Sequence, residues 1–490
     1  MASSPHDLRY AWRVCSVASL GLILIGIAGS TLNVALPVVV RHFRATPLES
    51  GWILLSYLLV MTASMVFFGR VADLLGRRET YLAGFALFTV ASLLAGFAPN
   101  VWFLVAMRVL QAAAAAMILA NGAVIITHAF PPDKLSRGMG VYIGTLSVAQ
   151  LAGPSLGGLI AETAGWQWIF WVNVPAGVIA VILGMLVLRK VPRGPRRPVD
   201  ALGNLLIFAA LCAALLAVSE PDTFLYGGAA LCLVLVPLIV LVEKRSSHPV
   251  LDKRLFAGKT LIFGNAASFC NALARAALVL LAALHFQAAR GMDAFTAGLC
   301  VLPVAVGMAI ASPVAGLLRA SPYAITVGGS LFSAAGLGLL MVFADPEVPY
   351  WPIGVALFLA GCGSGAFLTG NTTQMMSALP SDSLGVVNGL RVMIMNVGIV
   401  LSVGVSLSML TSSVSPAVRD QVYAATLDEV SPVAVAQLMD GFRLTYAVLF
   451  GVALVGAVLS ALARDPNRKA LDPVDEVRAD AGHLPGKLDV

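Results

Sequence analysis

The stretch Gly69-Arg-Val-Ala-Asp73-Leu-Leu-Gly76-Arg77-Arg78 decides the fold of this chain. It carries charge, and it lies between two long apolar runs, Trp52–Phe68 and Tyr81–Ala98. A segment this short cannot form a domain. Since each flanking run approaches the roughly 20 apolar residues that cross a bilayer, we expect the charged stretch to join two helices at one face of a membrane.

The composition of the whole chain supports this interpretation. Its 490 residues are 59% hydrophobic and only 11% charged, and the mean hydropathy is +0.90. A soluble protein would carry about a quarter charged residues. Long apolar runs recur along almost the whole sequence, and hydrocarbon offers the backbone no hydrogen-bond partners, so we predict an all-α polytopic membrane protein.

The breaks between apolar runs predict fourteen spans. Lys and Arg test this count, since they collect in cytoplasmic loops. With the N-terminus inside, 23 of the 31 basic residues fall in inner segments and 5 in outer ones. We therefore expect both termini in the cytoplasm, a plasma-membrane location, and a basic charge that reflects topology and not nucleic-acid binding. The predicted spans are 14–36, 51–68, 80–98, 101–127, 139–161, 168–188, 201–219, 226–242, 260–288, 295–318, 322–344, 352–378, 385–411 and 441–463.

Two long basic loops divide these spans into six, two and six. This pattern predicts two six-helix bundles around a central cavity, with two extra central helices between them. The outer loop 411–440 contains a potential amphipathic segment. The predicted units are a first bundle (1–190), two extra helices with basic loops (191–258), a second bundle (259–465) and a disordered cytoplasmic tail (466–490).

Cysteine and histidine spacing predicts neither metal ligands nor a cofactor site. The six cysteines lie in apolar runs, so we interpret them as reduced packing residues. Clustered catalytic residues are also missing from the sequence, which argues against a membrane enzyme. The Gly361-Cys-Gly363-Ser-Gly365 run superficially suggests a dinucleotide loop, but it lies inside a predicted span and is interpreted as helix packing.

Four motifs of the first half together indicate a family resemblance, the first three by their positions in the first predicted bundle. They are the charged stretch, Arg108-Val-Leu-Gln111, Gln150-Leu-Ala-Gly153-Pro154-Ser-Leu-Gly157-Gly158, and Thr31-Leu-Asn33-Val-Ala-Leu-Pro37. Together with fourteen spans they resemble the drug:proton antiporter branch of the major facilitator superfamily. The resemblance covers nearly the whole chain. It implies a multidrug-exporter-like carrier that works by alternating access.

The charged stretch has a physical interpretation of its own. Gly69 and Gly76 permit a tight reversal, and Asp73 can pair with Arg77 or Arg78. Each contact is weak, so it can break and re-form in every transport cycle. The resemblance implies a gating loop that closes the inner face against the span at 385–411. The alternative is a solvated positive loop with a topological role only.

Arg108 lies in the middle of a predicted span. An arginine there costs at least ~2.5–3.5 kcal/mol on insertion scales, so it should face a cavity or a partner. The resemblance links the matching arginine, with Gln111, to proton coupling, although Ala112 replaces the family's glycine.

The glycine-proline motif predicts close helix packing and a kink. Small residues one turn apart let helices approach, and Pro154 removes a backbone donor. The resemblance implies a bend at the interface between the bundles that favours export, formed by Gly153, Pro154, Gly157 and Gly158. The alternative is packing alone.

The sequence departs from the family at the residue that commonly binds the proton. Relatives commonly carry an aspartate where this chain has Ala28, and no predicted span contains a central carboxylate. Coupling to protons would then fall to Glu162, Asp73 or His285, since a proton carrier needs a titrating group in its path.

Two further arginines are unusual. Arg275 lies within a predicted span, whereas Arg391 begins one and is interpreted as snorkelling to the inner surface. With Arg108, Arg275 would make a cavity electropositive, and Arg391 is a further candidate for its lining. The amide side chains that could also line this cavity are Asn33, Gln150, Asn271 and Asn371.

Two functions follow. The preferred one is proton-coupled export of hydrophobic or amphipathic small molecules by a monomer in the bilayer. The alternative is a carrier for an anionic or lipid-like substrate that binds Arg108 and Arg275.

Overall fold

In a computed structural model of the chain, all of the secondary-structure elements among the described residues are helices. The structure describes residues 8–189, isolated positions between 203 and 213, and 221–245, 258–292, 294–343, 345, 347–378, 384–410 and 432–464. Within these residues, nine stretches are long and apolar enough to cross a membrane. The all-α expectation is confirmed. The total of fourteen spans remains a prediction, because the predicted span at 201–219 lies largely outside the described residues.

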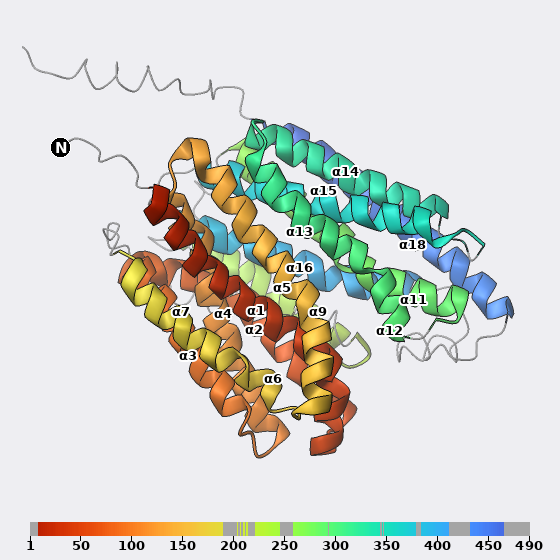
Figure 1. The fold of residues 1–490 in the computed structure, drawn as a ribbon, viewed down its shortest axis with the longest axis horizontal. Coiled ribbons are helices and arrows are strands. Elements are labelled where there is room, and N and C mark those ends of the chain that lie inside the picture. The colour runs from red at the N-terminus through yellow and green to blue at the C-terminus, as the bar shows by residue number, and fades with distance from the viewer. Residues whose placement is uncertain are drawn as a thin grey trace, which may run out of the picture.

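The helices gather in two groups, as Figure 1 shows. In the first group α1 packs against α5 and α4, while α2 and α3 both pack on α4. The helices of this group are α1 (Leu8–Phe43), α2 (Pro47–Leu75), α3 (Arg77–Ala95), α4 (Val101–Ala129), α5 (Leu135–Thr163), α6 (Trp168–Trp171) and α7 (Asn173–Val187).

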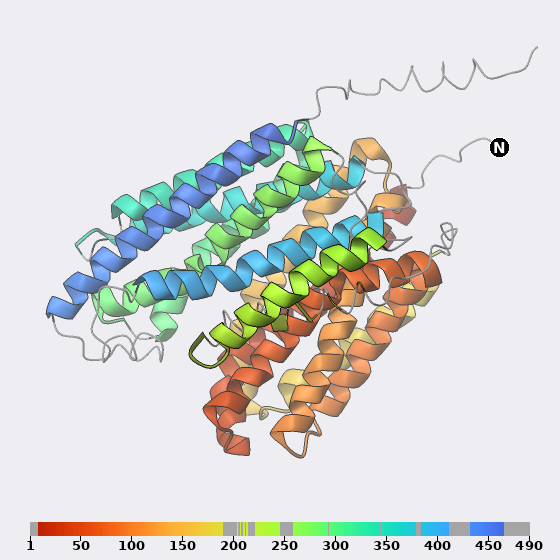
Figure 2. The ribbon, with the colours of Figure 1, turned by 180° about the vertical axis from the view of Figure 1, so that it is seen from behind.

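In the second group α15 packs against α14 and α13, and α18 packs against α14 and α10. The group consists of α10 (Lys259–Ala276), α11 (Leu278–Arg290), α12 (Ala294–Cys300), α13 (Leu302–Leu317), α14 (Pro322–Phe343), α15 (Tyr350–Ser377), α16 (Leu384–Leu410) and α18 (Pro432–Leu462). Between the two groups in sequence lies α9 (Pro221–Arg245). Figure 2 shows α16 crossing from one group toward the other. The exact unit boundaries remain predictions.

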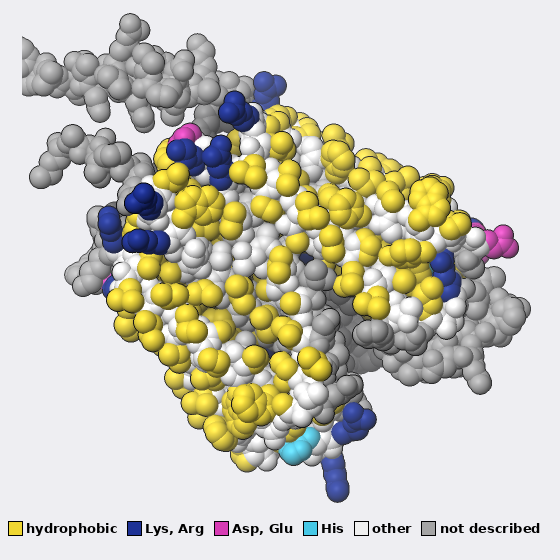
Figure 3. Space-filling model, viewed as in Figure 1, with side chains coloured by type: hydrophobic (Ala, Val, Ile, Leu, Met, Phe, Trp, Pro, Cys, Tyr) yellow, Lys and Arg dark blue, Asp and Glu magenta, His cyan; other side chains and the backbone are white. Residues whose placement is uncertain are grey.

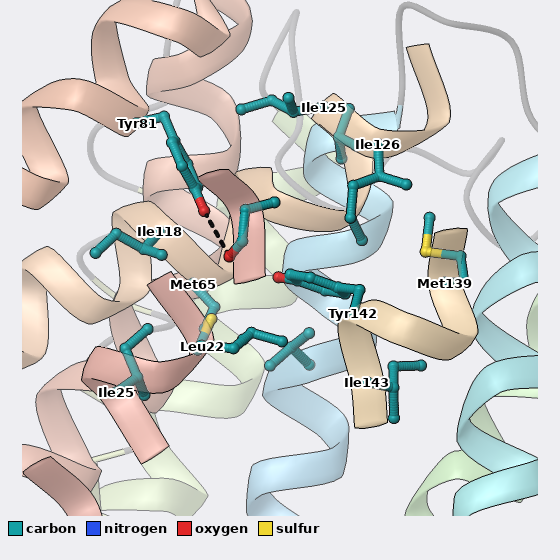
Figure 4. Close-up of a cluster of buried hydrophobic side chains, with 14 of the residues drawn as sticks. Leu22, Ile25, Met65, Tyr81, Ile118, Ile125, Ile126, Met139, Tyr142 and Ile143 are labelled. Carbon is teal, nitrogen blue, oxygen red and sulfur yellow. Dashed lines mark hydrogen bonds between the residues drawn. The ribbon is translucent and has the colours of Figure 1, made fainter. Parts of the chain in front are cut away.

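Apolar side chains fill the first group and also cover its outer face. Tyr81 points inward from α3, and its hydroxyl donates to the Ala18 carbonyl oxygen of α1 at 3.2 Å (Figure 4). Leu22, Ile118 and Tyr142 come from three other helices into the same cluster. Figure 3 shows apolar side chains spread over the flanks of both groups, with lysine and arginine gathered near the ends. This distribution matches a protein whose sides face lipid.

Three predicted spans are interrupted. The span predicted at 260–288 is divided into α10 and α11 at Ala277, and the one at 295–318 is divided at Val301. The span at 168–188 is divided at Val172. The last helix begins at Pro432, earlier than its predicted start at 441, so part of the expected outer loop 411–440 is helical and the rest lies outside the described residues.

The interruption at Ala277 has a visible cause. In a continuous helix the Ala277 amide would donate to the Leu273 carbonyl. Instead it donates to the Ser402 hydroxyl of α16 at 2.9 Å, and this hydroxyl donates to the Leu273 carbonyl. A side chain inserted into the helical hydrogen-bond ladder is an established cause of kinks.

Candidate gating and transport site

The two groups meet through α16. Asn388, near the start of this helix, donates from its Nδ2 to the carbonyl oxygens of Leu119 and Ala120 in α4, at 3.1 and 2.9 Å. Asn388 is fully buried. Since each carbonyl oxygen has two lone pairs, α4 accepts these bonds without losing its own.

Glycines bring the backbones of the two groups together nearby. A Cβ on Gly389 of α16 would lie 2.7 Å from the Met65 carbonyl oxygen of α2. Across α5 and α13, a Cβ on Gly140 would lie 2.5 Å from the Ser312 carbonyl oxygen, and one on Gly316 would meet Ser136. All of these contacts lie toward the end of the molecule that holds the α2–α3 reversal. Among the described residues, this end is where the groups are joined.

The reversal depends on one residue. Gly76 alone separates α2 from α3, and its φ of +111° is a conformation that favours glycine. The predicted tight reversal is therefore confirmed at Gly76. It is wrong for Gly69, which lies inside α2. The residues from Arg70 to Leu75 continue the helix, so the turn shrinks to a single position.

Asp73 pairs with Arg77, as one of the two predicted pairings requires. The nearest nitrogen and oxygen are 3.1 Å apart. Arg77 also contacts both ring nitrogens of His128 in α4, at 3.2 and 3.1 Å. Arg78 takes another role, since it donates to the carbonyl oxygens of Leu188 and Met185 at the end of α7. Such a cation satisfies carbonyls that the helix end leaves free.

Arg108 is buried in a cluster of neutral partners. It donates to Gln111 at 3.0 Å and to the Ile53 carbonyl oxygen at 3.4 Å, and it stacks 4.0 Å from the Tyr57 ring centre. Gln111 in turn donates to Ser92 at 2.7 Å. The side chain therefore has partners within the first group. The described residues place no carboxylate against it, so its predicted coupling role remains a prediction.

Two glycines of the glycine-proline motif face a different neighbour from the one expected. A Cβ on Gly153 would meet Ser30, and one on Gly157 would meet the Thr31 backbone, both on α1. These two glycines therefore pack within the first group, whereas Gly140 and Gly144 approach the second. The helical repeat explains this, because positions 13 residues apart on one helix point in different directions.

The predicted cavity residues differ in their surroundings. Asn371 is satisfied inside the second group, because it accepts from Ser268 at 2.8 Å and donates to the Gly264 carbonyl oxygen at 3.1 Å. Arg391 is buried and donates to Asn388 at 3.1 Å. Arg391 thus lies beside the contact between the groups, and the prediction that it snorkels to the surface is wrong.

Asn271 and Arg275 form the other set. They lie one turn apart on α10, and neither forms a side-chain hydrogen bond or ion pair with any described residue. Asn271 is buried and Arg275 partly buried. The Arg275 Nε atom is itself buried without a partner in the described part of the chain.

Among the remaining predicted residues, Gln150 and His285 have described side chains. Gln150 is exposed on α5. His285 is buried between the rings of Phe286 and Phe442. The other predicted residues lie on described helices, but their side chains are outside the described set: Asn33, Pro154, Gly158 and Glu162. The glycine run at 361–365 packs α15 against α13 and α14, as predicted.

Sequence reasoning missed three residues of this region: His128, Asn388 and Ser402. Asn388 and Ser402 are polar residues within an apolar run, and that contrast is the signal that could have identified them. Their partners could not be foreseen, because backbone carbonyls of other helices leave no trace in the sequence.

Two helical groups with nine described stretches long and apolar enough to cross a bilayer indicate a multi-pass membrane protein. The family model of the Major Facilitator Superfamily matches residues 18–403, with a second match over 265–485. The chain therefore belongs to this superfamily, and it is a transporter and not an enzyme.

Individual comparisons agree with this membership. The chain is 30% identical to multidrug resistance protein Stp of Mycobacterium tuberculosis, over 86% of this chain and 80% of that protein. It is 28% identical to riboflavin transporter RibZ of Clostridioides difficile, over 77% and 83%. The crystal structure of the human organic anion transporter MFSD10 matches with a TM-score of 0.66 at 14% identity, over 92% of this chain and 99% of that one. At this identity the structural match supports the fold alone.

Proposed function

We propose that this transporter exports hydrophobic or amphipathic small molecules by alternating access and that protons drive it. One observation carries the proposal: the described contacts between the two groups lie at the end that holds the α2–α3 reversal. With both termini in the cytoplasm, this end is the cytoplasmic one. The arrangement then corresponds to a carrier closed on its inner side.

The strength of the contacts fits such a cycle. Two neutral hydrogen bonds from Asn388 contribute on the order of 1–3 kcal/mol in total, and the glycines add close packing of the two backbones. A closure of this size can be opened by a modest change in binding energy. The name of Stp supports drugs as substrates, while the name of RibZ shows that similar chains carry other molecules.

Asp73 is the acid best placed to couple protons to the closure. It pairs with Arg77, which contacts His128 on α4, so these contacts connect the ends of three helices. Protonation would neutralise the carboxylate and weaken this pair. Glu162 remains the second candidate for the proton site.

Flux into reconstituted vesicles with an imposed pH gradient tests the proposal. We expect a panel of hydrophobic compounds to move only when the gradient is present, and Asp73→Asn to reduce this flux strongly while the protein stays folded. Asp345→Asn is a matched control, since it weakens an ion pair with Arg443 (2.7 Å) that lies outside the closure. Gradient-independent flux would refute proton coupling, and wild-type flux from Asp73→Asn would refute the gating role.

A further inference from the structure

We infer that Asn271 and Arg275 form a recognition site for an anionic oxygen group of an amphipathic substrate. The inference rests on the proposed transport function and names the substrate class: an apolar molecule bearing a carboxylate, sulfonate or phosphate. Arg108 and Arg275 both lie within apolar runs, but their side chains differ in their contacts. Arg108 has hydrogen-bond and ring partners, whereas Arg275 has none among the described residues.

The position of the site follows from the helix that carries it. α10 packs against α15, α16 and α18. Gly264 and Ser268 turn toward α15, where both meet Asn371. Asn271 and Arg275 are three and seven residues beyond Ser268, so they continue the same face. That face is directed into the second group and not toward lipid.

The chemistry of the two side chains matches an anion. Arg275 presents a planar fork of donors that suits carboxylate and phosphate oxygens. Asn271, one turn away, offers a further amide donor. An arginine within the membrane is costly unless a partner or water satisfies it, and no described carboxylate pairs with Arg275. A substrate anion supplies the missing partner.

The backbone around Arg275 is held in place independently of any ligand. The Ser402 hydroxyl bridges Leu273 and Ala277, which flank the arginine at two residues on either side. Ser402 is therefore a positioning residue. It holds the last turn of α10, and so the backbone from which the Arg275 side chain extends. A preorganised donor loses less entropy when it binds.

Three compounds of one size test the site: 4-biphenylcarboxylate, its neutral amide, and the corresponding methylammonium. Binding is measured to the purified full-length protein. We expect the carboxylate to bind the wild type more tightly than the amide, and Arg275→Gln to weaken carboxylate binding by about 10- to 100-fold, the range for hydrogen bonds to a charged group. Amide binding should change less than about twofold, since the amide makes no ionic contact.

Three further variants serve as an intermediate, a second test and a control. Arg275→Lys keeps the charge but loses the fork, so it should fall between wild type and Arg275→Gln. Asn271→Ala should weaken binding of the carboxylate but not binding of the amide. Arg290→Gln is the matched control, because it removes one positive charge at the end of α11, away from the site, and should leave carboxylate binding unchanged. If Arg275→Gln does not fold, Arg275→Lys and Asn271→Ala decide the question.

Several outcomes would overturn the inference. One is equal affinity of the wild type for the carboxylate and the amide. Another is a ratio of carboxylate to amide affinity that stays at its wild-type value in folded Arg275→Gln. A third is the same unchanged ratio in both Arg275→Lys and Asn271→Ala. If phosphatidylglycerol competes with the carboxylate in wild type but not in Arg275→Gln, the site is supported and the anion is a lipid phosphate. Vesicle flux separates the two proposals: movement of none of the three compounds contradicts transport of this class, whereas movement without preference for the carboxylate contradicts only the anion site.

Discussion

At the scale of single residues, Gly76 carries the largest conformational demand. It is the one residue between α2 and α3, with φ at +111°. Gly76→Ala should cost about 1–3 kcal/mol, the range for a side chain held in a sparsely populated backbone region. We expect a lower melting temperature of the purified protein and reduced flux.

Gly328→Ala is the control for this prediction. A Cβ at Gly328 of α14 would meet nothing within 4 Å, and alanine in a helix interior is favoured over glycine. Its melting temperature should therefore equal or exceed that of the wild type. Equal stability of both variants would show that the reversal tolerates a side chain.

Residue types alone predicted part of this picture. The pairing of Asp73 with Arg77 follows from their spacing of four on a helix. The contrast between Arg108 and Arg275 could not be predicted, because both are single cations in apolar runs. Their difference lies in neighbours from other helices: Tyr57 and the Ile53 carbonyl for the first, and the Ser402-bridged turn for the second.

At the scale of elements, the crossing of α5 and α13 sets how closely the two groups approach. A Cβ at Gly140 would lie 2.5 Å from the Ser312 carbonyl oxygen. Since backbone cannot rotate away as a side chain does, Gly140→Ala should force the helices apart at the closed end. Spin labels at Asp133→Cys and Arg319→Cys, both exposed and in a background without the six native cysteines, should report a longer mean distance.

Gly298→Ala supplies the comparison, because a Cβ there would meet nothing within 4 Å. A label distance that is the same in wild type, Gly140→Ala and Gly298→Ala would mean that α5 and α13 accommodate the methyl group without separating.

The helices themselves were well predicted, because apolar length is a direct consequence of bilayer thickness. Their interruptions were not. The interruption at Ala277 coincides with a hydrogen bond to a hydroxyl on α16, more than a hundred residues away in sequence. The neighbour of Gly153 and Gly157 was likewise misassigned, since periodicity gives the faces of a helix but not the helix that covers each face.

At the scale of the whole molecule, Asn388 joins the two groups with hydrogen bonds to Leu119 and Ala120. Asn388→Ala removes both bonds, on the order of 1–3 kcal/mol, and should shift the equilibrium between inner-closed and inner-open states by roughly 5- to 150-fold. The same spin-label pair should show a larger population at long distance.

Asn396→Ala is the matched control, because Asn396 is a buried asparagine of the same helix whose Nδ2 atom has no partner in the described part of the chain. Its distance distribution should resemble that of the wild type. An unchanged distribution in Asn388→Ala would show that these bonds do not hold the closed end.

The single helix α16 is hydrogen-bonded to other helices at two positions along its length. Near its start Asn388 hydrogen-bonds to the first group, and 14 residues later Ser402 hydrogen-bonds to the turn of α10 that bears Arg275. At 1.5 Å per residue these points are roughly 20 Å apart along a single helix. A tilt of α16 about any point other than Ser402 displaces the turn of α10 when it breaks the Asn388 bonds. With such a tilt, opening the inner end would also shift the turn that bears Arg275, and separation of the two halves would be coupled to the proposed anion site.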